Sequence, residues 1–278
     1  MTDEQKPSSD PAQPEASEEL TDQVAEAVTG AGEPAEQAAE AGADAAQTAE
    51  GAEEVLLDEE KVKDEIEIQI DLLKDSDWAV RREAVVTLGE MGDERCVAPL
   101  VRALRDGDWQ VREAAVEALG MVGSPAVEPL LRQLRDWDIR KFVIRALGKI
   151  KDERVLEPLI GQLRSDEFNL DATEALVELG EPAVERLVAA LKDKDELARK
   201  QAVIALGRIK SAAALEPLIE MLKDKDWFTR LTAAAALEKL GDPKGREAIK
   251  PLLNDPDLVV KMRVERILAA WKKSPASA

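Results

Sequence analysis

The sequence predicts an all-α protein: an α-solenoid of about seven stacked helix pairs, preceded by a disordered acidic tail. The first observation is that landmark residues recur at intervals of 28 to 31 residues, and a period of that length is typical of stacked helical units. The second is composition, because aromatic residues make up only 3 % of the chain while Ala and Leu are abundant, which favours helices over strands. Since one such unit cannot bury its own apolar face, we expect the stack itself to be the fold. The recurring leucines are Leu88, Leu119, Leu147, Leu176, Leu206, Leu237 and Leu268.

The first segment, residues 1–54, differs sharply in composition from the rest of the chain. It holds 15 Asp and Glu residues against the single Lys6, which accounts for most of the net charge of -20. Such a segment buries too little apolar surface to offset its ordering entropy, so we expect disorder. Leu20, Val24 and Val28 would share one face of a short helix induced by a partner; the alternative is a tail that only improves solubility. The predicted organisation is therefore a tail at 1–54, a solenoid at 55–271 and a loose end at 272–278.

The periodic region is predicted to consist of paired amphipathic helices, fourteen in all. An opening helix is expected from about residue 58 to residue 74. In residues 92–106, Val97, Leu100, Val101 and Leu104 recur with the spacing of one helix face, and residues 107–123 show a second helix of the same kind. Aspartates precede most of the second helices, where a carboxylate can accept from the free N–H groups of the first turn. These predicted capping residues are Asp77, Asp108, Asp195, Asp226 and Asp257.

The repeated text resembles the HEAT-like repeats first associated with phycobilisome lyases. The resemblance covers about residues 58–271 and is carried by GDERCVAPLVRALRDGDWQVREAAVEALG, with echoes in KDERVLEPLIGQLRSD and KDKDWFTRLTAAAALEKLG. It implies a right-handed superhelix in which first helices line the convex side and second helices line the concave side. It also implies a hydrogen-bonded ladder between neighbouring units, formed by an Asp series and an Arg series. On this sequence the ladder would comprise Asp77, Arg81, Asp108, Arg112, Asp136, Arg140, Asp195, Arg199, Asp226 and Arg230.

A partner-binding surface is predicted on the second helices, because four of the five tryptophans directly follow the Asp position of a unit. Trp supplies a large contact area at little entropic cost, so such a row suits a protein-binding groove. Two interpretations stay open, since each indole could instead pack over the adjoining loop. Neighbouring basic and acidic stripes on this face, around Lys149 and Glu178, are expected to neutralise each other. The predicted binding residues are Trp78, Trp109, Met121, Trp137, Lys141, Phe142, Arg145, Leu197, Trp227, Phe228 and Leu231.

The sequence argues against several other functions. The chain has no histidine, which excludes histidine-based catalysis and the His-Glu iron ligands of deoxyhypusine hydroxylase, a protein with similar repeats. Phosphate-binding glycine motifs are absent, so we predict no catalytic residue, metal or cofactor. An acidic repeat region argues against nucleic acid, and no apolar run is long enough to span a membrane.

The predicted function is therefore a non-catalytic scaffold that binds a helix or extended segment of another protein in the cytoplasm. The single cysteine, Cys96, fits a reducing compartment and is read as a small core residue. Three alternatives remain: a bilin chromophore lyase, an oxidoreductase-class relative and a nucleic-acid-binding HEAT-like protein. The sequence does not predict the oligomeric state.

Overall fold

The computed structural model describes residues 64–273, and within this range every regular element is helical. This confirms the predicted all-α solenoid of seven helix pairs. The predicted acidic tail, the first part of the opening helix and the chain after residue 273 lie outside the described residues. The helices are α1 (Glu65–Leu72), α2 (Trp78–Met91), α3 (Val97–Ala103), α4 (Trp109–Val122), α5 (Val127–Gln133), α6 (Arg140–Lys149), α7 (Leu156–Gln162), α8 (Asn169–Leu179), α9 (Val184–Ala190), α10 (Glu196–Ile209), α11 (Leu215–Met221), α12 (Trp227–Leu240), α13 (Pro243–Ile249) and α14 (Leu258–Lys273).

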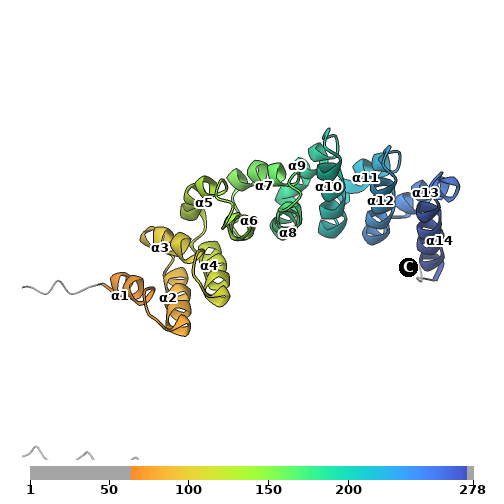
Figure 1. Cartoon of the computed structure of the whole chain (residues 1–278). Helices are drawn as coiled ribbons and strands as arrows, with labels where there is room; N and C mark the ends of the chain where they lie inside the picture. The colour runs from red at the N-terminus through yellow and green to blue at the C-terminus, as the bar shows by residue number, and fades with distance from the viewer. Residues whose placement is uncertain (1–63, 274–278) are drawn as a thin grey trace, which may run out of the picture. The chain divides into compact units, whose positions relative to one another are not determined.

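The helices form two rows, odd-numbered helices in one and even-numbered helices in the other (Figure 1). Neighbouring even-numbered helices pack more extensively on each other than neighbouring odd-numbered helices do. Six of the seven landmark leucines are fully buried between the rows, and Leu268 in α14 is partly buried. The core is therefore a continuous strip along the stack, as the period of the sequence predicts.

The odd-numbered helices are shorter than the sequence predicts. Residues 94–96 form a 3-10 turn, and α3 follows from Val97 to Ala103. Pro99 is the third residue of α3. It lies in the first turn, where backbone N–H groups have no acceptor within the helix, so the N–H group that proline lacks is not missed. The same arrangement of a short 3-10 turn and a seven-residue helix recurs at α5, α7, α9 and α11.

Aspartates cap five of the seven even-numbered helices, as the sequence predicts, while α6 and α8 have no side-chain cap. Asp77 accepts from the backbone N–H of Ala79 at 2.9 Å, and Asp108 accepts from that of Gln110 at 2.8 Å. Equivalent bonds are made by Asp195, Asp226 and Asp257 at α10, α12 and α14. These bonds fix the start of each of the five helices and hence the position of its first side chain.

The arginine ladder uses a different aspartate from the one that the resemblance implies. The Nε and Nη2 atoms of Arg81 donate to the carboxylate of Asp106 in the next repeat, at 2.8 Å each. Its Nη1 atom donates to the backbone carbonyls of Asp75 and Ser76, just before α2. Arg230 binds Asp255 in the same way, at 2.8 and 2.7 Å. The partner lies two residues before the capping aspartate, and its carboxylate also accepts from the backbone N–H of that aspartate, as Asp106 does from Asp108 at 2.9 Å. Arg199 likewise binds Asp224, not Asp226.

This ladder is interrupted in the middle of the stack. Arg112 bonds only to the carbonyls of Asp106 and Gly107, and its guanidinium lies over the ring of Phe142, 5.4 Å from the centroid. Arg140 lies over the ring of Phe168 in the same manner, at 5.1 Å. The carboxylate of Asp136 instead binds Arg105. Cation–π contacts of Arg112 and Arg140 therefore take the place of the ladder ion pairs in this part of the stack.

A buried polar cluster joins α8 to α10, where the sequence departs from the repeat. The Gln201 side chain donates to Asn169 Oδ1 at 2.9 Å, and the Thr173 hydroxyl contacts Gln201 Oε1 at 3.0 Å. Thr173 also lies 2.7 Å from the carbonyl oxygen of Asn169. All three side chains are buried, so Gln201 depends on Asn169 and Thr173 for its hydrogen bonds, while the Asn169 amide nitrogen donates to the carbonyls of Ser165 and Asp166.

Replacing Thr173 with valine is expected to lower the free energy of unfolding by about 1–3 kcal/mol, because the isosteric change leaves Gln201 buried without one partner. Urea unfolding followed by circular dichroism measures the change. Thr87→Val is the matched control, since the Thr87 hydroxyl donates only to the carbonyl of Glu83 in its own helix. Equal losses in both variants would contradict a role for the cluster in joining the two helices.

Acid is expected to destabilise the stack through its ladder carboxylates. The hydrogen bond from Arg81 lowers the pKa of Asp106 below its ordinary value of 3.8, and Arg230 does the same for the pKa of Asp255. A lowered folded-state pKa means that the stabilisation is complete above the unfolded-state pKa and is lost as the pH falls through the folded-state pKa. With no histidine in the chain, stability should change little from about pH 8 to pH 5.5 and fall below about pH 4. Urea midpoints across this range test this, and a loss between pH 8 and 6 would contradict it.

Candidate functional site

Three tryptophans lie at the same place in their helices, on the exposed edge of the even-numbered row. Trp78, Trp109 and Trp227 are the first residues of α2, α4 and α12, each directly after its capping aspartate. Their exposed fractions are 41 %, 61 % and 41 %, which is high for so large an apolar side chain. The caps hold these indoles in position, yet the described part of the chain leaves much of their surface open.

Trp137 does not belong to this set, and its predicted equivalence is wrong. It lies in the loop three residues before α6 begins at Arg140. Its indole Nε1 donates to Glu167 at 2.8 Å, and its ring meets Phe168 edge-on with centroids 6.4 Å apart. Trp137 therefore packs against the next loop, which is the alternative that the sequence left open. Asp136, which precedes it, corresponds to Asp106, because each lies two residues after the C-cap leucine of the preceding helix, Leu134 and Leu104.

Exposed apolar side chains continue the row in the later even-numbered helices. The ring of Phe228 meets Trp227 edge-on, with centroids 5.6 Å apart, and Lys200 lies over the Phe228 ring at 5.5 Å. At the second position of its helix, Leu170 is exposed and Leu197 is half-buried. We call the following set the apolar row: Trp78, Trp109, Leu170, Leu197, Trp227, Phe228, Leu258 and Val259.

The other predicted binding residues lie apart from the apolar row. Met121 is exposed in the last turn of α4, far along the helix from Trp109, and Lys141 is exposed in α6. Phe142 is half-buried beneath the guanidinium of Arg112, and Leu231 is half-buried against the core. The sequence placed all of them on one face because it could not separate the start of a helix from its end.

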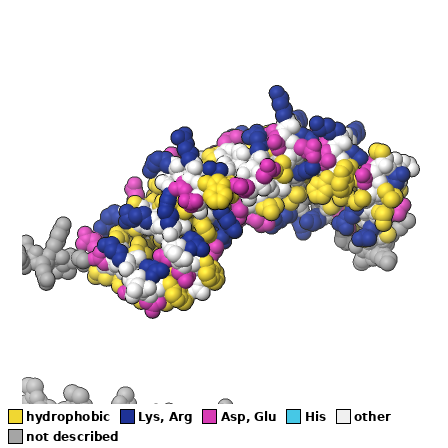
Figure 2. Space-filling model, viewed as in Figure 1, with side chains coloured by type: hydrophobic (Ala, Val, Ile, Leu, Met, Phe, Trp, Pro, Cys, Tyr) yellow, Lys and Arg dark blue, Asp and Glu magenta, His cyan; other side chains and the backbone are white. Residues whose placement is uncertain are grey.

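Charges on the even-numbered helices are largely paired from one repeat to the next. Arg145 donates to both carboxylate oxygens of Glu113 at 2.6 Å, and this hydrogen bonding lowers the pKa of Glu113. Lys149 lies 3.0 Å from both Glu117 and Glu178. Figure 2 shows Lys and Arg side chains beside Asp and Glu side chains along the stack, with hydrophobic patches between them.

Two more residues complete the electrostatics of this face. Arg208 donates to Glu174 at 2.7 Å, and this hydrogen bond lowers the pKa of Glu174. Asp171 is an exception, because burial raises its pKa despite the nearby cations. The face therefore carries both signs of charge, mostly compensated, as the sequence predicts for its basic and acidic stripes.

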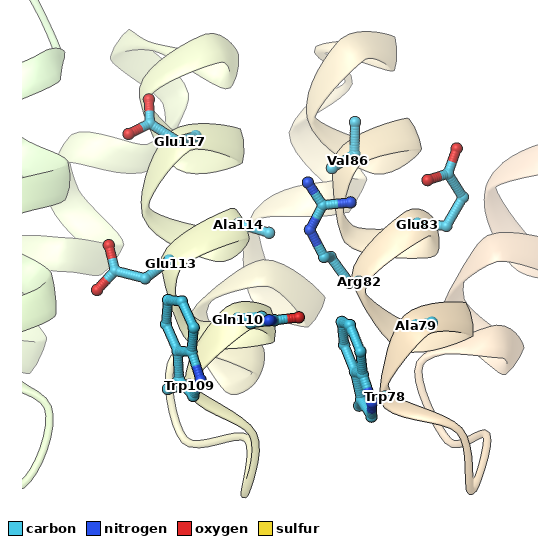
Figure 3. A pocket seen from close by; sticks show the side chains of 10 residues that line it. All are labelled: Trp78, Ala79, Arg82, Glu83, Val86, Trp109, Gln110, Glu113, Ala114 and Glu117. Carbon is cyan, nitrogen blue, oxygen red and sulfur yellow. The ribbon is translucent and has the colours of Figure 1, made fainter. Parts of the chain in front are cut away.

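A groove of about 630 Å³ lies between α2 and α4 and contains the first two members of the apolar row. Figure 3 shows Gln110 between the two indoles and Arg82 pointing into the space between the helices. Glu113 and Glu117 point away from it, on the side of α4 opposite to α2, where they meet Arg145 and Lys149. The sequence did not predict Gln110 as a lining residue, because the residue directly after Trp109 was not assigned to the same face of the helix. The lining comprises Trp78, Ala79, Arg82, Glu83, Val86, Trp109, Gln110, Glu113, Ala114 and Glu117.

Stacked helix pairs with one continuous core and an open apolar row define an α-solenoid repeat protein. A family model described as HEAT repeats matches residues 66–136 and 184–269, together more than half of the 278 residues. A second, described as PBS lyase HEAT-like repeat, matches residues 139–164. The chain belongs to the HEAT repeat family, of the type that includes phycobilisome-lyase repeats.

Three of the solved structures to which the chain is similar are the following. Human deoxyhypusine hydroxylase in complex with glycerol is 23 % identical, with a TM-score of 0.35 over 75 % of this chain and 85 % of that one. The complex of CpcE and CpcF of phycocyanin lyase from Nostoc sp. PCC7120 is 23 % identical, with a TM-score of 0.38 over 74 % and 94 %. The archaeal HEAT-like repeats protein from Thermococcus onnurineus NA1 is 13 % identical, with a TM-score of 0.41 over 74 % and 97 %. No curated protein matches the chain.

Two further observations concern residues 64–273 alone. None of the helices in this range combines the length and the apolar composition needed to cross a bilayer. No three Cys, Asp or Glu side chains of this range converge in a way that could hold a metal ion.

Proposed function

We propose that this protein is a non-catalytic scaffold that binds a partner protein along the apolar row of its even-numbered helices. The observation that carries the proposal is the exposure of a large apolar side chain in the first turn of five even-numbered helices, α2, α4, α8, α12 and α14. Exposed aromatic side chains of this kind dominate the energy of protein interfaces. Charges paired between repeats leave the face without a strong preference for nucleic acid.

The anchors that we propose are Trp78, Trp109, Trp227 and Phe228, since these four are exposed and held by capped helix starts. Trp137 is left out because its indole N–H is already bonded to Glu167. The remaining predicted residues Met121, Lys141, Phe142, Arg145, Leu197 and Leu231 would contribute at the edge of the interface or through the stack. We propose the cytoplasm as the place of binding, since the single Cys96 is buried and forms no disulfide within the chain.

Affinity capture from native lysate tests this proposal, with the full chain as bait beside a Trp78→Ala, Trp109→Ala, Trp227→Ala and Phe228→Ala variant. Circular dichroism first establishes that both baits are folded. A protein retained by the full chain and reduced tenfold or more on the variant is the expected result, because truncating several interface anchors costs at least that much affinity. Trp137→Ala is the matched control and should retain the partner.

Equal retention on all three baits would contradict binding at the apolar row. Copurification of a coloured small molecule with the full chain, in place of a protein, would favour a chromophore lyase.

A further inference from the structure

Most of the free polar groups that line the α2–α4 groove are hydrogen-bond donors, and the Gln110 amide offers both a donor and an acceptor. Neither indole N–H, of Trp78 or of Trp109, has a partner among residues 64–273, and neither does the side chain of Gln110 or Arg82. The carboxylates of Glu113 and Glu117 are paired with cations of α6, and Glu83 points away from the groove (Figure 3). The groove therefore favours an occupant that supplies several acceptors, while the Gln110 oxygen can accept one bond from it.

A segment in the polyproline II conformation has this chemistry. Its backbone makes no internal hydrogen bonds, so its carbonyl groups are free to accept, and each proline lacks an N–H group that would need a partner. An amphipathic helix would instead use its carbonyls internally and leave the groove donors unsatisfied. Aromatic-lined grooves are a recurring way to bind such preformed, low-entropy segments.

The spacing of the repeats also suits this conformation. Polyproline II completes a turn in three residues at about 3.1 Å each, so residues i and i+3 share one face about 9.3 Å apart. Packed helices lie about 8–10 Å apart. Helices α2 and α4, which begin at Trp78 and Trp109, pack directly on each other. Two side chains separated by three residues can therefore each meet one indole.

We propose that the α2–α4 groove binds a proline-rich segment of a partner protein in the polyproline II conformation. Prolines at i and i+3 lie against Trp78 and Trp109, while Gln110, Arg82 and the indole N–H groups donate to carbonyls of the segment. The inference rests on the proposed function and specifies its partner: of a helix and an extended segment, it selects the extended one.

Fluorescence anisotropy of fluorescein-labelled dodecaproline, titrated with the full chain, tests the inference. Saturable binding is expected, with a (Gly-Ser)6 peptide of the same length bound at least tenfold more weakly because it is not preformed. Trp78→Ala with Trp109→Ala should weaken dodecaproline binding tenfold or more. Gln110→Glu keeps the shape of the side chain but replaces its donor, and should weaken binding at least fivefold. Trp109→Phe keeps a ring without the N–H group and should weaken binding in the same direction.

Trp137→Ala is the matched control, since Trp137 is as exposed as Trp109 but has its N–H group bonded, and it should leave the affinity unchanged. Absence of saturable binding, or binding that Gln110→Glu and the double tryptophan variant leave unchanged, would overturn the inference. Its failure is distinguishable from failure of the proposed function: a captured partner that depends on the apolar row but binds as a helix would refute only the polyproline segment.

Discussion

Replacing Asp255 with asparagine is expected to lower the free energy of unfolding by about 3–5 kcal/mol, a large part of the stability of an ordinary domain. Asp255 is only 2 % exposed on its side chain and its partner Arg230 is 11 % exposed, so the pair is largely removed from water. The substitution keeps the shape of the side chain but leaves a buried guanidinium without its counter-charge. It also weakens the bond through which Asp255 accepts from the backbone N–H of Asp257, 2.9 Å away, just before α14.

The measurement is urea unfolding at pH 7, with the midpoint and slope fitted together. Glu216→Gln is the matched control, because Glu216 forms its ion pair with Lys244 on the surface, where both side chains are more than 60 % exposed. That change should alter stability by less than about 1 kcal/mol. If the two variants lost similar amounts of stability, the Arg230–Asp255 pair would contribute no more than an exposed ion pair and would not stabilise the contact between repeats.

The period of the sequence predicts the stack because every unit must satisfy the same packing requirement. Leu88, Leu119 and Leu147 recur since each fills the space between two rows of helices, and the structure buries all three completely. Capping is equally local, so Asp77 and Asp108 could be assigned from their position before an amphipathic run. Features decided within one unit are therefore predictable without knowledge of its neighbours.

Contacts between units were less predictable, and Trp137 shows why. The third unit is shorter than the second, so Asp136 stands nearer to Leu147 in the sequence than Asp106 does to Leu119. Counting back from Leu147 therefore places Asp136 at the capping position, although in space it corresponds to Asp106. The same limitation misplaced the ladder, because the next repeat offers Arg81 two aspartates and only the geometry shows that Asp106 is the one it binds.

The prevalence of hydrogen-bond donors in the α2–α4 groove could not be predicted from the sequence, for a related reason. Whether Glu113 faces the groove as a free acceptor depends on Arg145, which lies one repeat further on and takes both of its oxygens. The tryptophans alone indicate an apolar site. The ion pairs to α6 occupy the carboxylates of Glu113 and Glu117, and this leaves mostly hydrogen-bond donors for an occupant of the groove.

Gly148→Ala is expected to destabilise the stack by about 3 kcal/mol, although alanine is normally the better helix former. Gly148 is buried in α6 where α8 crosses it, and a Cβ there would lie 2.6 Å from both Cα and Cβ of Ala175. Backbone cannot give way as a flexible side chain would, so the two helices must move apart. That movement would loosen the contacts on which the repeats on either side of α6 and α8 depend.

Gly161→Ala provides the matched control for this close approach. Gly161 lies inside α7, its added Cβ would meet nothing within 4 Å, and its φ is not positive. Helix propensity alone then applies, and the variant should be unchanged or more stable by up to about 1 kcal/mol. Thermal and urea unfolding of the two variants beside the full chain measure the contrast. A Gly148→Ala protein as stable as the Gly161→Ala protein would mean that α6 and α8 can separate without cost, and the solenoid would then owe its rigidity to the ladder rather than to helix contact.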